Sequence, residues 1–130
     1  MRDSGERRTE APPPRPPGRS AVFAHVPAVS VRAIPDGSLL LDVREPDEWR
    51  AGHAPQAVHA PVSAFFSHLD DLPTDRVVAV VCAVGTRSTQ VAAWLNANGW
   101  DAVNVDGGMV AWVAAGLPME SESGLPPSVL

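Results

Sequence analysis

The chain of 130 residues contains no lysine and a single cysteine, Cys82. A lone cysteine has no partner for an internal disulfide, and no cluster of cysteines and histidines at zinc-ligand spacing accompanies it, which is typical of a reducing compartment. The ten basic residues are all arginine, and fifteen acidic residues outnumber them, giving a formal charge of -5. Binding to phosphate backbones would need a local basic patch, so we expect no nucleic-acid partner.

Long apolar runs are also missing. A bilayer span needs roughly 18 to 20 apolar residues, and charge or proline interrupts every candidate segment. The first twenty residues carry charges of both signs and a Pro-rich stretch, residues 11–18, in place of the apolar core of a signal peptide. We therefore expect a cytoplasmic protein that has no membrane partner.

The length and the placement of proline predict one domain with two tails. A chain of this size allows a single core, and 45% of its residues are apolar. Residues 1–21 have too few apolar groups to offset the entropy of ordering, so we expect a disordered Pro/Arg-rich arm, with an SH3-type ligand as the alternative. Residues 22–119 are predicted to form the domain, and residues 120–130 a flexible C-terminal tail.

Between these tails, short apolar runs alternate with helix-like segments, which is typical of α/β proteins whose parallel strands are joined by helices. Strands are predicted at residues 39–43, 57–60, 77–81 and 102–105, with an edge strand and one helical turn within residues 25–34. Helices are predicted at residues 46–51, 62–69, 87–98 and 108–115. Pro46 and the acids that follow it suit a first helical turn, whereas Asn98-Gly99 suits a left-handed cap.

The loop that follows the apolar run 77–81 carries the clearest chemical signal. Cys82 ends this run, and residues 83–87 lead into a helix, so backbone N–H groups and the positive end of a helix dipole converge on the thiol. Such surroundings lower a thiol pKa and favour the nucleophilic thiolate. We expect Cys82 to be ionised, in an electropositive cup open to the outside. The alternative is a buried structural thiol.

Lowering a thiol pKa by about two units takes roughly 2.7 kcal/mol, and a helix terminus supplies about 0.3 to 1. Other groups in the loop must therefore contribute. Arg87 either folds over the loop carbonyls or offers its guanidinium to an anionic substrate. Thr86 is predicted to cap the helix, and Ser88 lies in its first turn. Four residues are expected to bind substrate through their backbones: Ala83, Val84, Gly85 and Thr86.

Several polar and aromatic residues outside the loop are interpreted as support for it. Asp42 and Arg44 lie at the end of an apolar strand and are predicted to have a buried hydrogen-bonding or ion-pair role beneath the loop, with a catalytic carboxylate as the alternative. His53 and His59 lack a third ligand nearby, so we expect no metal. The tryptophans are interpreted as packing residues, with Trp112 bordering the mouth of the site.

Five blocks of sequence together resemble the rhodanese family, in the order of that family: residues 41–49 (LDVREPDEW), 52–57 (GHAPQA), 82–88 (CAVGTRS), 107–112 (GGMVAW) and 115–118 (AGLP). The resemblance implies a five-stranded parallel sheet flanked by helices on both faces. It also implies a sulfurtransferase in which Cys82 takes sulfane sulfur from thiosulfate or a persulfide, becomes a persulfide, and passes the sulfur to cyanide or a thiol. The implied partners are a small anionic sulfur donor and a thiol acceptor, small or protein, and no metal or organic cofactor is implied.

Two departures from the family pattern concern the donor and a turn. Many thiosulfate-using members have a basic residue where this chain has Ala83, so we expect poor thiosulfate turnover. The second departure is Gln56, which replaces a glycine of the family pattern and concerns the local turn more than the chemistry. A low-turnover persulfide carrier or sensing module is therefore an alternative function. A small phosphatase or arsenate reductase is disfavoured, because related phosphatases place arginine six residues after cysteine, whereas Arg87 follows Cys82 by five.

Overall fold

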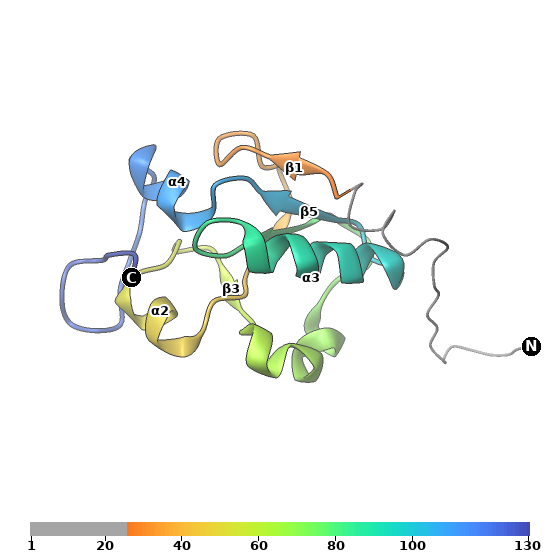
Figure 1. The fold of residues 1–130 in the computed structure, drawn as a ribbon, viewed down its shortest axis with the longest axis horizontal. Helices are drawn as coiled ribbons and strands as arrows, with labels where there is room; N and C mark the ends of the chain where they lie inside the picture. The colour runs from red at the N-terminus through yellow and green to blue at the C-terminus, as the bar shows by residue number, and fades with distance from the viewer. Residues whose placement is uncertain (1–25) are drawn as a thin grey trace, which may run out of the picture.

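The computed structural model describes residues 26–130, so the predicted arm, residues 1–21, and the predicted domain start at residue 22 lie outside the described residues. Within this range five parallel strands form one sheet in the order β1-β5-β4-β2-β3 (Figure 1). The predicted five-stranded parallel sheet is confirmed. The strands are β1 (Ala28–Val29), β2 (Leu39–Asp42), β3 (Val58–His59), β4 (Val78–Val81) and β5 (Ala102–Val105).

The central strand β4 is apolar throughout, and each of its residues is 0% exposed. Such a continuous apolar run is expected for a parallel strand that is covered on both faces. Strand β2 pairs with β4 from Leu39↔Val78 to Asp42↔Val81. Because the carboxyl ends of these two strands lie side by side, the residues after β4 emerge next to those after β2, where open α/β sheets place their binding sites.

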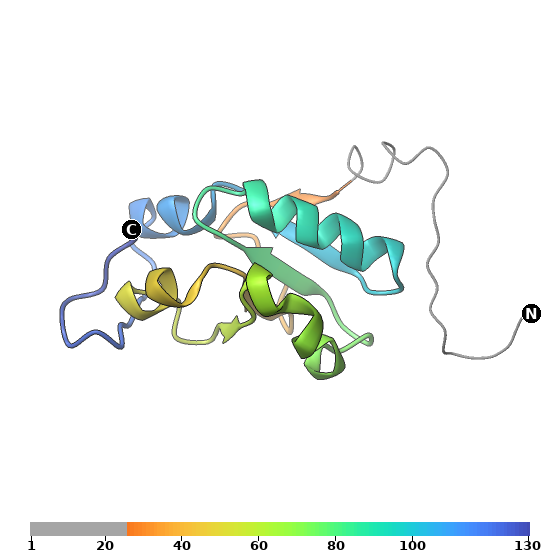
Figure 2. The same ribbon diagram turned by 60° about the horizontal axis from the view of Figure 1, so that its bottom comes forward.

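Helical segments cover both faces of the sheet, as predicted (Figure 2). On one face η1 (Val62–Asp71) and α3 (Thr86–Ala97) pack their apolar side chains against β2 and β4. On the other face α4 (Gly108–Ala114) contributes Met109 and Trp112 to a second apolar cluster. None of the helices found between residues 26 and 130 combines the length and apolarity needed to cross a membrane.

Helix α2 (Pro46–Ala51) begins at the predicted proline and ends before Gly52. Its N-terminus forms a capping box, in which the Glu45 side chain accepts from the N–H of Glu48 and the Glu48 carboxylate accepts from the N–H of Glu45 at 3.0 Å. This reciprocal pair satisfies two backbone donors that the helix itself leaves free. It also fixes the Glu48 carboxylate at the start of the helix.

Two segments differ from the predictions. The segment predicted as an amphipathic helix at residues 62–69 is a 3₁₀ helix over residues 62–71, broken at Ala64, whose φ is -130°. Phe65 is buried, whereas the adjacent Phe66 is 66% exposed. Phe65 is thus the residue of this segment that is buried in the core.

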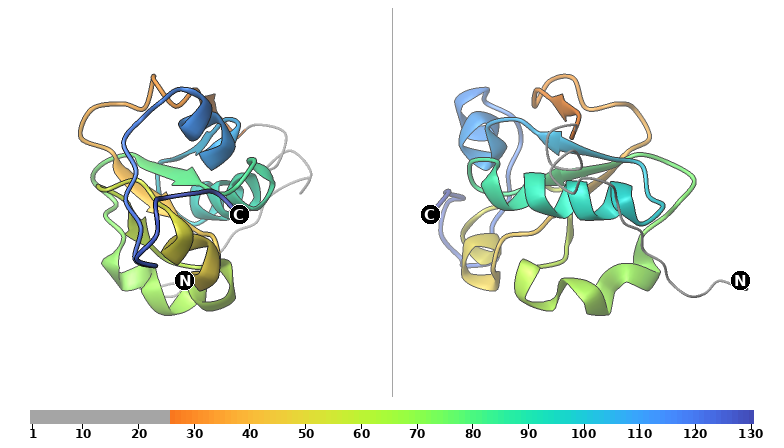
Figure 3. Two further views of the ribbon diagram at one scale, coloured as in Figure 1. Left: turned by 90° about the vertical axis from the view of Figure 1, so that its left-hand side faces the viewer. Right: turned by 45° about the vertical axis from the view of Figure 1, so that its right-hand side comes forward.

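The C-terminal segment, predicted as a flexible tail from residue 120, lies against α2 (Figure 3). His53 and Glu120 exchange two backbone hydrogen bonds of 2.9 Å, and the Ser128 N–H donates to Ala51 O at 2.9 Å. The Glu122 N–H donates to Arg50 O at 2.9 Å. The bonds from Glu122 and Ser128 use carbonyls at the end of α2, and the pair with His53 lies just beyond it, so the segment packs back against the domain.

Candidate active site

The loop between β4 and α3 positions Cys82 at the carboxyl edge of the sheet. Gly85 has a φ of 114°, a left-handed conformation that favours glycine, and it is the residue that caps α3. Thr86 is the first residue of the helix, so the prediction that it caps the helix is wrong. The turn at Gly85 directs the first amides of α3 back towards the end of β4.

Two backbone N–H donors and one hydroxyl surround the Cys82 sulfur. The N–H of Gly85 lies 3.1 Å from Sγ, the N–H of Ser88 lies 3.4 Å away, and the Ser88 hydroxyl oxygen lies 3.2 Å away. Burial raises the pKa of the thiol, but the hydrogen bonds from Ser88, Gly85 and Val84 outweigh it, so the pKa lies below its ordinary value. The loop therefore favours the thiolate, which is the nucleophilic form.

The sulfur is more enclosed than the sequence predicts. Cys82 is 0% exposed and belongs to the apolar cluster beneath α3, so the expected opening to the outside is not present. The loop around it is at the surface, since Val84 is 61% exposed. A reactant therefore reaches Sγ only when the loop or the side chains that cover it shift.

The N-terminus of α4 holds the opposite side of the loop. The Met109 N–H donates to Cys82 O at 2.8 Å, and the Val110 N–H donates to Ala83 O at 3.1 Å. Gly108 has a φ of 58°, and a Cβ there would lie 2.5 Å from Ala83 O and closer still to Cys82 O. Only glycine fits this approach. The loop carbonyls are thus engaged by α4, while loop amides face the sulfur.

Ser88 connects the sulfur to the next strand. Its hydroxyl donates to Asn104 Oδ1 at 2.5 Å, and the same hydroxyl oxygen lies 3.2 Å from Cys82 Sγ. A hydroxyl carries one proton, so Asn104 and a thiolate compete for it. Asn104 was not predicted as a site residue, although it is the one polar residue in the otherwise apolar strand β5, where it is 6% exposed.

Arg87 pairs with Glu48 and not with the loop carbonyls; its predicted contact with an anionic substrate stays a prediction. Its guanidinium donates to Glu48 through both terminal nitrogens, at 2.7 and 2.9 Å. The hydrogen bond to Arg87 lowers the pKa of Glu48 despite partial burial. The same bond raises the pKa of Arg87 above its ordinary value, and the Cys82 thiolate contributes in the same direction. Glu48 was missed, although its position in the first turn of α2 is a recognisable capping signal.

Asp42 and Arg44 form a fully buried ion pair, and both side chains are 0% exposed. Arg44 Nη2 donates to Asp42 Oδ2 at 2.8 Å, and Nε donates to Oδ1 at 3.0 Å. A further bond of 2.7 Å joins Arg44 Nη2 to Gly52 O, tying the end of β2 to the end of α2. Both carboxylate oxygens of Asp42 are thus engaged by Arg44, which matches an ion pair beside the loop better than a free catalytic carboxylate.

The two histidines flank Trp49 in a stack. The ring centroids of His53 and Trp49 are 3.6 Å apart, and those of His59 and Trp49 are 4.6 Å apart. His59 Nε2 lies 2.6 Å from Arg44 O and donates to it. In the part of the chain that the structure describes, no group of three or more His, Cys, Asp and Glu side chains is arranged to hold a metal ion.

The chain shares its sequence and its fold with known proteins. A family model described as the rhodanese-like domain matches residues 29–115. The chain belongs to the rhodanese-like domain family. A sulfurtransferase of Allochromatium vinosum is 37% identical over 87 residues, which are 66% of this chain and 81% of the relative.

Two solved structures are similar to this rhodanese-like domain. A rhodanese-related protein of Thermoplasma volcanium has 29% identity and a TM-score of 0.64, covering 72% of this chain and 97% of the other. A rhodanese-like domain protein of Staphylococcus aureus has 30% identity and a TM-score of 0.60, covering 79% of this chain and 99% of the other. The expected family and α/β fold are therefore confirmed.

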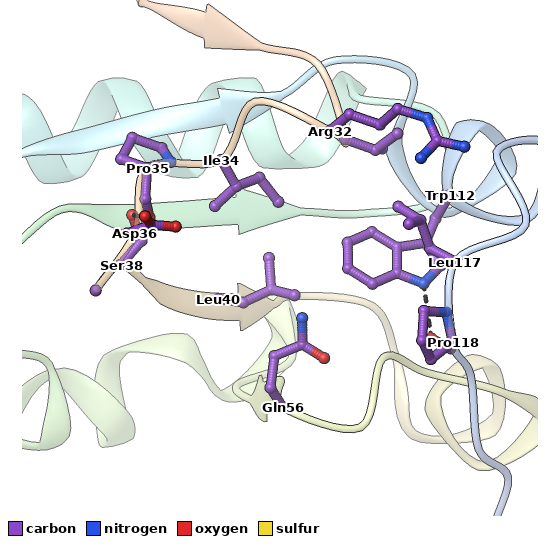
Figure 4. Close-up of a pocket in the computed structure, with 12 residues that line it drawn as sticks. Arg32, Ile34, Pro35, Asp36, Ser38, Leu40, Gln56, Trp112, Leu117 and Pro118 are labelled. Carbon is purple, nitrogen blue, oxygen red and sulfur yellow. Dashed lines mark hydrogen bonds between the residues drawn. The ribbon is translucent and has the colours of Figure 1, made fainter.

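A cavity of about 460 Å³ lies elsewhere in the rhodanese-like domain (Figure 4). Its walls come from residues 31–32, 34–38 and 117–118 together with Leu40, Gln56 and Trp112, and no residue of the loop 82–88 lines it. Trp112 is 3% exposed, and its Nε1–H donates to Pro118 O at 2.9 Å. The prediction that Trp112 borders the mouth of the cysteine site is therefore wrong, because its ring packs between α4 and the sheet.

Proposed function

We propose that the protein is a sulfurtransferase that carries sulfane sulfur as a persulfide on Cys82. The observation that carries this proposal is the set of donors from Gly85 and Ser88 on the sulfur, at 3.1 to 3.4 Å. Such donors stabilise a thiolate before the reaction and a charged terminal sulfur after it. The Allochromatium vinosum relative, named a sulfurtransferase, supports the same reaction class.

In the first half of the proposed cycle, the Cys82 thiolate attacks the outer sulfur of thiosulfate or of a persulfide. The new sulfur–sulfur bond forms as the old one breaks, and sulfite or a thiolate leaves with the electron pair. In the second half, cyanide or an acceptor thiol attacks the terminal sulfur, and the Cys82 thiolate leaves with its electron pair. Cys82 is thus regenerated without any net change in oxidation state, so the cycle needs no added oxidant.

The test of turnover is thiocyanate formation from cyanide. Wild-type protein with a sulfane-sulfur donor is expected to form thiocyanate, and Cys82→Ser is expected to form none above the rate without protein. Equal rates in the two proteins would reject Cys82 as the nucleophile. A comparison of thiosulfate with a persulfide donor in the same assay gives the donor preference, for which Ala83 predicts low thiosulfate activity.

A second candidate function is a persulfide carrier with low turnover. It is favoured by the complete burial of Cys82 and by the pairing of Arg87 with Glu48, which both restrict access to the sulfur. A carrier is expected to load one sulfur per chain and to release it slowly to small thiols. Many rapid turnovers with small donors and acceptors would contradict the carrier and support the enzyme.

A further inference from the structure

We propose that Glu48 is a specificity-determining, positioning residue: by occupying the Arg87 guanidinium it competes with the oxyanion group of thiosulfate and so favours persulfides, which lack one, as donors. This inference rests on the proposed sulfur transfer through Cys82. It concerns which donor the same site accepts.

The competition follows from the geometry of the ion pair. A guanidinium binds oxyanions through parallel N–H groups, and both terminal nitrogens of Arg87 already donate to Glu48, at 2.7 and 2.9 Å. The Glu48 side chain is held in place, because its carboxylate also accepts a hydrogen bond from the Glu45 N–H at 3.0 Å. Its side chain is 16% exposed, against 35% for Arg87. A donor oxyanion must therefore displace an anchored carboxylate in order to bind Arg87.

The charges around the loop also disfavour a thiosulfate dianion. Arg87 is the only charged side chain among residues 82–88 other than the ionised thiol, because Ala83 is neutral. Arg44, the other cation nearby, is already paired with Asp42. The Cys82 thiolate, Glu48 and Arg87 together carry one positive and two negative formal charges. A thiosulfate dianion thus meets a loop with excess negative charge, where the Arg87 guanidinium is already paired with Glu48.

Thiosulfate and a persulfide differ in the leaving group that the site must accommodate. Thiosulfate breaks its sulfur–sulfur bond with release of sulfite, whose oxygens carry the departing charge. A persulfide transfers its outer sulfur with release of a thiolate, which has no oxyanion for Arg87 to bind. The loop amides of Gly85 and Ser88 receive the transferred sulfur in both reactions. Occupation of Arg87 by Glu48 therefore hinders thiosulfate and leaves a persulfide unaffected.

The experiment measures loading of Cys82 from two probes, thiosulfate and the persulfide of 2-mercaptoethanol, which has no oxyanion. Glu48→Gln removes the charge but keeps a side-chain oxygen that accepts from the Glu45 N–H, so the capping box and the fold persist. The matched control is Asp47→Asn, which removes the same charge from an exposed neighbour on α2. Glu48→Asp, which keeps the charge, tests for recovery of the wild-type preference.

In Glu48→Gln the KM for thiosulfate is expected to fall about fivefold, equivalent to about 1 kcal/mol, while kcat for thiosulfate and both constants for the persulfide stay close to wild type. Asp47→Asn is expected to leave the preference between donors unchanged. Equal changes for both donors, or the same fall in Asp47→Asn, would overturn the role of Glu48. Wild-type protein that takes sulfur from neither probe would instead refute the proposed function itself.

Discussion

Gly108 is the position where one added methyl group most directly tests the structure of the loop. The substitution Gly108→Ala puts a Cβ 2.5 Å from Ala83 O and closer to Cys82 O, at a φ of 58°. The atoms that the new Cβ would meet are backbone carbonyls of the loop, which cannot change position by a side-chain rotation. Either α4 moves away from the loop or the loop carbonyls turn, and both movements break the bonds from Met109 and Val110.

The magnitude follows from two contributions. An alanine in the left-handed region costs about 1 to 2 kcal/mol, and two lost hydrogen bonds cost about 0.5 to 1.5 kcal/mol each. We therefore expect Gly108→Ala to lower the free energy of unfolding by about 2 to 5 kcal/mol, a large part of the 5 to 15 kcal/mol of a typical domain. Gly116→Ala is the matched control, because Gly116 has a φ of 72° and nothing within 4 Å of its would-be Cβ. Gly116→Ala should therefore be destabilised only by the cost of placing alanine in the left-handed region.

Urea denaturation of both variants gives the two free energies of unfolding, and sulfur loading of Cys82 in native buffer gives the effect on the site. Gly108→Ala is expected to be the less stable variant by about 1 to 3 kcal/mol and to load sulfur more slowly, whereas Gly116→Ala loads at the wild-type rate. Equal destabilisation of the two variants, with loading unaffected in both, would refute the argument that α4 holds the loop.

Two further predictions concern the Cys82 pKa. Ser88→Ala removes a hydroxyl that can donate to the thiolate and should raise the Cys82 pKa, whereas Asn104→Leu removes the competing acceptor and should lower it. The pH midpoint of thiol alkylation measures both shifts. Shifts of the same sign would contradict a proton shared between Cys82 and Asn104. The Cys82 pKa in the folded protein lies below the unfolded value of about 8.5. At any pH between these two pKa values, the unfolded chain therefore binds more protons than the folded protein. The free energy of unfolding of wild type relative to Cys82→Ala should therefore rise with pH in this window and fall as pH drops through the folded-state pKa. Urea titrations across the window check this, and a flat difference would contradict it.

The elements that local sequence defines were predicted closely. Strand β4 is a continuous apolar run because both of its faces are buried, and such a run is visible without knowledge of its neighbours. Pro46 marks the start of α2, and Gly99, with a φ of 101°, follows the end of α3 as the predicted left-handed cap. These signals depend on backbone preferences within a few residues, so they can be predicted from one sequence.

The parts that depend on distant partners could not be predicted. Residues 120–130 have the composition of a tail, but their backbone groups pair with the end of α2. The sequence indicates Cys82 and its loop, whereas the pairing of Arg87 with Glu48 joins residues 39 positions apart. The link from Ser88 to Asn104 and the close approach of Gly108 likewise arise from how β5 and α4 pack beside the loop. The burial of Cys82 is a further consequence of this packing.

The central claim is that Cys82 accepts and holds one sulfur atom. Intact-protein mass spectrometry after exposure to a persulfide donor, followed by removal of the donor, measures this directly. The account predicts a mass increase of one sulfur atom per chain that maps to the Cys82 peptide, disappears on treatment with cyanide, and is absent in Cys82→Ser. An unmodified wild-type mass, or the same increase in Cys82→Ser, would contradict it.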